Sequence, residues 1–232
     1  MTRTFCSRTA RCLPTLVLSI SIVACGSGDS TDNAATEARR AELATLSGTY
    51  AEAVASDLQA NPEAMQLAAD LFTLECGGCH GADASGDRGV TDLTRGHFDY
   101  GATEDAIRTT IREGRRSEMP GMGREYGEVE LGQIVAYLYT LITDAPLNDY
   151  ETRGQEFYVA TCVACHGEDG RGITAVGGSD LTDDYWAHGD SMMNKRLVIT
   201  RGATSECPPG LESLSSAEVE LLTAWVMNLI ES

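Results

Sequence analysis

One pentapeptide pattern occurs twice in this 232-residue chain and constrains its fold more than any other feature. Residues 76–80 read Cys-Gly-Gly-Cys-His, and residues 162–166 read Cys-Val-Ala-Cys-His. Cys-x-x-Cys-His is the attachment signature of c-type haem, in which two thiols form thioethers with the porphyrin and the histidine binds the iron. The predicted attachment residues are Cys76, Cys79, Cys162 and Cys165, and the predicted proximal iron ligands are His80 and His166.

Two other uses of such cysteine pairs are a zinc site and a redox dithiol. A zinc site would need both pairs as ligands, and their separation of 86 residues is far from the spacing of ribbons or fingers. A thioredoxin-like dithiol would lie near a βαβ pattern, which this sequence does not show. The sequence therefore predicts two covalent haem c groups, which would also supply the core volume that a chain with 6% aromatic residues is short of.

The residues around the two motifs repeat as well, which predicts a duplicated unit. Asp83 and Gly86 match Asp169 and Gly172 at an offset of 86, and Asp92-Leu-Thr matches Asp180-Leu-Thr at an offset of 88. We expect one unit over residues 62–144 and a second over residues 145–232. The later offset of 88 also aligns Gly114 with Gly202 and Tyr137 with Trp225.

Each unit reads as three main helices, so we predict an all-α fold of two cytochrome-like domains. Asn61 and Thr103 have the side chains of helix N-caps, and residues 128–142 place apolar side chains at helical spacing. The expected helices cover residues 62–75, 104–113 and 128–142 in the first unit, and 150–161, 191–201 and 216–230 in the second.

The motif region, an x-Leu-Thr loop, Gly-Arg followed by Met-Pro, and a last helix with Ala-Tyr or Ala-Trp together resemble class I cytochromes c in tandem. The pattern covers residues 62–232 and is similar to the dihaem subunit of cb-type haem–copper oxidases. This resemblance implies transfer of single electrons. It also implies that Met119 is the sixth ligand of the first iron, with Met122 as its rival, and that Arg115 lies near a haem propionate.

The second unit departs from that pattern, because Cys207 stands where the methionine is expected. Cys207 could ligate the second iron as a thiolate, it could be a buried thiol, or the sixth position could be open. A thiolate would lower the potential of the second haem, so electrons would flow from the second haem to the first. The alternative ligands nearby are Met192, Met193, Lys195 and His188.

The N-terminus predicts export and lipidation. Residues 1–24 hold three arginines, no acid and an apolar run that is too short to cross a bilayer, which is the layout of a signal peptide. The run ends in Ile-Val-Ala before Cys25, which resembles the lipobox of bacterial lipoproteins. We expect a lipid on Cys25, a flexible linker over residues 25–61 and a location on the periplasmic side of the envelope. Gly26 favours the outer membrane.

The formal charge of −18 excludes a nucleic-acid partner and predicts redox partners with basic docking patches. We expect a periplasmic electron carrier of a respiratory chain, held to the membrane by its lipid alone, and we assign no catalytic residue. One alternative is an enzyme whose second haem, ligated by histidine and cysteine, oxidises a small sulfur compound. Another alternative is a cytochrome subunit of a larger oxidase or dehydrogenase.

Overall fold

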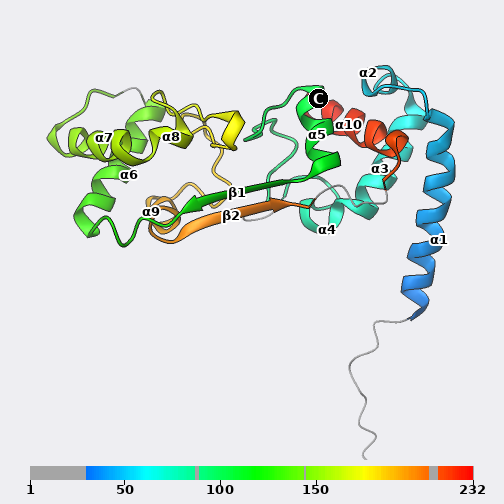
Figure 1. Ribbon diagram of the computed structural model, residues 1–232, viewed down its shortest axis with the longest axis horizontal. Coiled ribbons are helices and arrows are strands. Elements are labelled where there is room, and N and C mark those ends of the chain that lie inside the picture. Colours follow the sequence, from blue (N-terminus) through cyan, green and yellow to red (C-terminus); the bar gives the residue numbers. More distant parts are fainter. Residues whose placement is uncertain (1–29, 87–88, 144, 209–213, 232) are drawn as a thin grey trace, which may run out of the picture. The chain divides into compact units, whose positions relative to one another are not determined.

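The computed structural model describes residues 30–86, 89–143, 145–208 and 214–231. The chain divides into residues 1–37 and residues 38–232, and both haem motifs lie in the second part (Figure 1). Its elements are α1 (Ser30–Ser47), η1 (Gly48–Tyr50), α2 (Ala55–Leu58), α3 (Pro62–Glu75), α4 (Gly77–His80), α5 (Glu104–Glu113), β1 (Arg115–Pro120), α6 (Glu128–Thr143), α7 (Asp149–Thr161), α8 (Val163–His166), η2 (Thr174–Val176), α9 (Met192–Arg201), β2 (Gly202–Cys207) and α10 (Ser216–Glu231).

The six predicted helices are present, and their local start signals explain where they begin. The Asn61 side chain accepts hydrogen bonds from the first turn of α3, and Thr103 caps α5 in the same way. Ser191 is the N-cap of α9. The all-α class is therefore confirmed, although two short strands, β1 and β2, pair with each other in the part of the chain that the structure describes.

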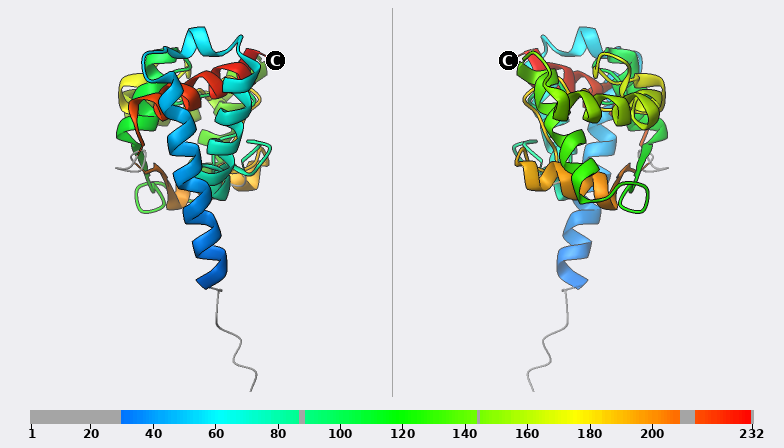
Figure 2. Two further views of the ribbon diagram at one scale, coloured as in Figure 1. Left: turned by 90° about the vertical axis from the view of Figure 1, so that its right-hand side faces the viewer. Right: turned by 90° about the vertical axis from the view of Figure 1, so that its left-hand side faces the viewer.

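The helices form two groups, and the last helix of each repeat belongs to the group of the other repeat. We call α2, α3, α4, α5 and α10 the first compartment, and α6, α7, α8 and α9 the second compartment. Helix α10 packs on α2, α3 and α5, whereas α6 packs on α7 and α9 (Figures 1 and 2). The repeats follow one another in the sequence, but their packing is interleaved.

Two pairs of aromatic rings show this exchange. Trp225 of α10 stacks on Phe72 of α3 with ring centroids 4.0 Å apart, and Tyr137 of α6 contacts Tyr158 of α7 at 5.3 Å. Phe72 and Tyr158 are both fully buried. Tyr137 and Trp225 thus each lie against the first helix of the other repeat and not of their own.

The strands β1 and β2 carry the chain between the compartments. They pair antiparallel and form a two-stranded ribbon. Ser117 lies opposite Ser205, and these two residues correspond to each other at the repeat offset of 88. The ribbon thus has an approximate twofold symmetry of its own. Gly202 begins β2 at a φ of +78°, and a Cβ there would lie 2.4 Å from the Met119 carbonyl oxygen, so a larger residue does not fit.

The region predicted to be a flexible linker contributes to the first core. Leu43, Ala55 and Leu58 are almost completely buried with the apolar side chains of α3 and α10. Arg40 joins them through an ion pair of 2.6 Å with Glu75. The structure thus differs from the expected boundary at residue 61, because folded chain already begins in α1.

The expected signal peptide over residues 1–24 and the lipid-bearing Cys25 lie outside the described residues. Within the described part, no helix combines the length and the apolar character needed to cross a membrane.

Candidate haem sites

Each Cys-x-x-Cys-His motif forms a single helical turn directly after a longer helix. The amide of His80 donates to the Cys76 carbonyl at 3.0 Å, and the amide of His166 donates to the Cys162 carbonyl at 2.9 Å. A spacing of three residues puts both cysteines of a motif on one face of the turn. The histidine follows directly, so the three side chains can reach one ring.

Both motif histidines are held by a backbone carbonyl. Nδ1 of His80 lies 3.0 Å from the Thr91 carbonyl oxygen, and Nδ1 of His166 lies 2.9 Å from that of Ser179. A proton on Nδ1 leaves the lone pair of Nε2 for a metal, which is how second-shell partners orient a ligating imidazole. Burial lowers the pKa of His80, opposed by the hydrogen bond to Thr91, and so favours the neutral ring that binds iron.

The first cysteine of each motif, Cys76 or Cys162, is partly buried, whereas Cys79 and Cys165 are exposed. Burial raises the pKa of Cys76 to about 12, with a further contribution from the charges of Cys207, Glu75 and Cys79. Burial likewise raises the pKa of Cys162 to about 11. Redox dithiols need a lowered pKa, whereas a neutral thioether suits an apolar site. The two pairs also lie in different compartments, which argues against one zinc site built from all four.

The second compartment holds a cavity of about 440 Å³ beside its motif. Its lining includes Cys162, Cys165, His166 and Trp186, together with Met119 from β1. The indole Nε1 of Trp186 is buried without a hydrogen-bond partner in the described protein, so it can donate to a carboxylate of a bound group. Haem brings two carboxylates and a large apolar ring, so the residues present fit it.

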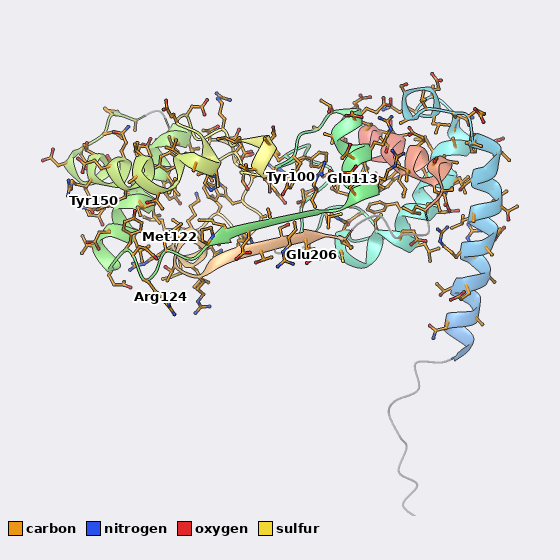
Figure 3. The ribbon with its side chains drawn as sticks, in the orientation of Figure 1. Tyr100, Glu113, Met122, Arg124, Tyr150 and Glu206 are labelled. Atoms are coloured by element: carbon orange, nitrogen blue, oxygen red, sulfur yellow. The ribbon has the colours of Figure 1, made fainter. Side chains whose placement is uncertain are left out.

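The ribbon determines which motif Met119 faces. Met119 lies near the end of β1 opposite Ala203, in the second compartment, where it shares the cavity with His166. The resemblance implied that it serves the iron of His80 instead. The structure differs because β1 leaves the first compartment after α5. Met122, labelled in Figure 3, lines the same cavity and remains the rival of Met119.

Cys207 lies at the opposite end of the ribbon, across from Arg115. Burial raises the pKa of the Cys207 thiol, the charge of Cys79 raises it further, and Arg115 opposes both. Cys207 therefore lies close enough to the motif of the first repeat to interact with it electrostatically. The repeat placed Cys207 at the second haem, whereas the fold places it beside Cys76 and Cys79.

Arg115 occupies the same site. Its Nε is buried and has no hydrogen-bond partner in the described protein, and its guanidinium lies 4.9 Å from the centre of the Tyr100 ring. Tyr100 is labelled in Figure 3. The Tyr100 hydroxyl donates to the Arg116 carbonyl at 3.0 Å, which fixes the ring beside the ribbon. A guanidinium with a buried, unused donor fits a carboxylate, as the resemblance implied for a propionate.

The other candidate ligands are less well placed. Met192 and Met193 are 55% and 70% exposed on α9. The Lys195 ammonium is buried and engaged, at 2.6 Å from Asp190. His188 does line the second cavity.

Sequence reasoning missed Trp186 in the second site and considered Lys195 there only as an alternative iron ligand. Trp186 and Lys195 contact each other, with the Lys195 ammonium 3.9 Å from the centre of the Trp186 ring and 4.3 Å from that of Tyr139. The sequence did hold a signal for Lys195. At the repeat offset of 88 it corresponds to the apolar Ile107, so a charged residue replaces an apolar one. A charged residue at a core position of a repeat is unusual unless it is paired.

Two helical compartments, each centred on a Cys-x-x-Cys-His turn with an oriented imidazole, define a dihaem c-type cytochrome. The chain belongs to the family described as cytochrome c oxidase, cbb3-type, subunit III, whose sequence model matches residues 63–138 and 150–226. The two covalent haem c groups follow from this membership and from the two complete motifs.

The relatives carry the same family description in their names. The chain is 35% identical over 196 residues to the cbb3-type cytochrome c oxidase subunit CcoP of Rubrivivax gelatinosus, covering 84% of this chain and 64% of that protein. It is 29% identical over 199 residues to subunit FixP of Azorhizobium caulinodans, covering 80% and 68%. The chain thus spans about two thirds of the length of these relatives.

Proposed function

We propose that this protein carries single electrons between redox proteins of a respiratory chain on the periplasmic side of the envelope. The observation that carries the proposal is the pair of motif histidines, each with Nδ1 bound to a carbonyl and Nε2 left for iron. Haem, when bound, supplies an iron that changes its charge by one electron. With no organic substrate to position, the protein's task is to hold and tune these irons.

The proposed roles of the side chains follow the fold. We call the haem attached at Cys76 and Cys79 the first haem and that attached at Cys162 and Cys165 the second haem. His80 ligates the first iron and His166 the second. Met119 completes the second site across the ribbon, and Cys207 occupies the corresponding position of the first.

Buried donors hold the carboxylates of the cofactor. Trp186 donates Nε1 in the second compartment, and Arg115 donates Nε in the first. Fixed, buried donors to these carboxylates take the place of water and limit the rearrangement that accompanies a change of charge. Within residues 30–86, 89–143, 145–208 and 214–231 neither donor has another partner, so binding of the cofactor also removes a cost to stability.

The mass and redox capacity of the matured protein test this proposal. The protein, produced in a host that attaches haem c, should gain the mass of two haems and take up two electrons per chain in a reductive titration. A double variant, Cys162→Ala with Cys165→Ala, should keep one haem and one electron. A colourless wild-type product would contradict the proposal.

A second candidate is a cytochrome subunit of a membrane oxidase, which the names of the relatives favour. In that case the partner is the oxidase itself. Affinity purification of the tagged chain from its own membranes distinguishes the two. Co-purification of an oxidase that consumes oxygen supports the subunit, and recovery of the chain alone, still able to exchange electrons, supports the free carrier.

Anchoring through a lipid on Cys25 is also part of the proposal. Mass spectrometry of the mature N-terminus should find a lipid on this residue, and Cys25→Ser should release the protein from membranes. The same preparation identifies the membrane, since sucrose-gradient fractionation separates inner from outer membranes. An unmodified cysteine at this position would overturn the anchor without affecting the haem sites.

A further inference from the structure

The two ends of the ribbon differ chemically although the ribbon is symmetric. Met119 and Cys207 occupy equivalent positions of the repeat. Met119 lines the cavity of the second motif, and Cys207, at the other end of the ribbon, lies within electrostatic reach of Cys79 in the first motif. We propose that the first haem has the lower potential, so that electrons enter at the first haem and settle on the second. This inference rests on the proposed function and adds a direction to it.

The first reason is the charge of the sixth ligand. Cys207 supplies a thiol that loses its proton on binding iron, and the resulting anion stabilises the more positive ferric state. Met119 supplies a neutral thioether, which favours the ferrous state. Arg115, opposite Cys207 on the ribbon, moderates the anion without cancelling it, because its guanidinium also lies against the Tyr100 ring.

The second reason is a buried cation that only the second compartment has at this repeat position. The side chain of Lys195 is completely buried, whereas its partner Asp190 is 70% exposed. Water screens the carboxylate more than the ammonium, so the ammonium is the less screened charge of this ion pair. Ile107, the counterpart of Lys195, is neutral and 5% exposed.

Lys195 also determines how Trp186 is presented. Its ammonium lies 3.9 Å from the centre of the Trp186 ring, which lines the cavity and whose Nε1 is buried without a hydrogen-bond partner in the described protein. A cation in this position attracts an added electron through a medium of low polarity. Lys195 is therefore a positioning and potential-setting residue for the second haem.

The two effects act in the same direction. One electron leaves the first iron, which becomes ferric, and reduces the second, which becomes ferrous, with no proton or bond change. The donor is a reduced one-electron protein and the acceptor an oxidised one. This direction is opposite to the one expected from the repeat, because the fold exchanges Cys207 and Met119 between the haems.

The test uses the matured, full-length protein with both haems. We expect a redox titration followed by visible spectra to show two separate steps, with an electron favouring the second haem at least about a hundredfold, or about 120 mV at 59 mV per tenfold. In a half-reduced sample, low-temperature EPR should show a remaining ferric signal of thiolate type.

Variants then assign each step to a residue. Cys207→Met should remove the thiolate signal. It should also raise the potential of the first haem, so that its reduced form is favoured at least about tenfold more than in wild type. Lys195→Met should lower the potential of the second haem, so that its reduced form is disfavoured by about threefold or more relative to wild type. Arg196→Met is the matched control, since it removes the same charge from the next residue of α9, where the arginine pairs with the exposed Glu128. It should leave both steps unchanged.

A variant without the first haem, Cys76→Ala with Cys79→Ala, shows which haem carries the thiolate ligand. If it matures, its thiolate signal should be absent, whereas a signal that persists there overturns the inference. Should it fail to fold, Cys162→Ala with Cys165→Ala decides the same point, because that variant keeps only the first haem and its thiolate signal should persist. Two haems with coincident potentials and no thiolate signal overturn the inference but leave the proposed function intact. Absence of covalent haem overturns the proposed function itself.

Discussion

Substitution of Arg40 by alanine tests whether α1 is part of the first haem compartment. Arg40 forms ion pairs with Glu75, at 2.6 Å, and with Glu218, whose side chain is 1% exposed. Without Arg40, Glu218 remains buried and keeps only the hydrogen bonds from the Ser215 amide and hydroxyl, at 2.7 and 2.8 Å. The variant therefore leaves an uncompensated charge inside the fold.

The size of the effect follows from this geometry. Removing one partner of a buried ion pair costs about 3–5 kcal/mol, and the retained bonds from Ser215 place the loss at the lower end, about 3 kcal/mol. For a protein of this size, that corresponds to a decrease of roughly 6–12 °C in the midpoint of thermal unfolding. The midpoint can be measured from the haem absorbance of the matured protein, because that band reports on the compartment directly.

Two controls separate this interaction from a general effect on α1. Arg39→Ala removes a neighbouring arginine that pairs with Asp70 at 2.6 Å but is 43% exposed, so it should lower the stability much less than Arg40→Ala does. Adding Glu218→Gln to Arg40→Ala removes the stranded charge and should restore most of the stability. Equal midpoints for Arg39→Ala and Arg40→Ala would refute the reasoning.

The effect should also depend on pH. Burial alone raises the pKa of Glu218, but hydrogen bonds from Arg40 and Ser215 outweigh it, and the pKa lies below its ordinary value. A lowered pKa in the folded state gives stability that is present above the unfolded pKa and is lost as the pH falls. The difference between wild type and Arg40→Ala should therefore shrink on acidification, and a difference that grows would contradict the assignment.

Three further predictions concern the ribbon and the surface. Met119→Ala should abolish the thioether–iron absorption of the second haem and leave the first haem unchanged, as judged in variants that retain only one haem. Loss of this absorption at the first haem would contradict the placement of Met119 beside the second motif. Gly202→Ala, at a φ of +78° and with a Cβ position 2.4 Å from the Met119 carbonyl oxygen, should lower the unfolding free energy by about 2 kcal/mol or more in a denaturant titration, and an unchanged midpoint would show that the ribbon yields. With a charge of −18, the protein should reduce a basic one-electron partner at a rate that falls steeply with salt in stopped-flow measurements, and a rate indifferent to salt would exclude electrostatic docking.

Much of the site was accessible from the sequence because its determinants are local. The spacing of Cys76, Cys79 and His80 within one turn identifies an attachment site before any tertiary contact is known. The helix bounds followed from caps such as Asn61 and Thr103, which act within four residues. The carbonyls that orient the histidines escaped prediction, because a backbone oxygen carries no sequence signal.

The linker prediction shows a different limit. The composition of residues 25–61 indicates little apolar surface, yet Leu43 and Leu58 are buried almost completely. A few apolar residues suffice when a preformed core, here that of α3 and α10, offers them a complementary surface. Average composition does not report such a local match.

The sequence alone determined that two haems are attached, that the chain is helical and that one methionine and one cysteine occupy equivalent positions. The tertiary structure decided which haem each of them faces. Because the two repeats are similar, α6 and α10 can bury comparable faces against either first helix, so apolar patterning does not distinguish the arrangements. The antiparallel pairing of β1 with β2 makes the choice, since it carries Met119 and Cys207 past one another into opposite compartments.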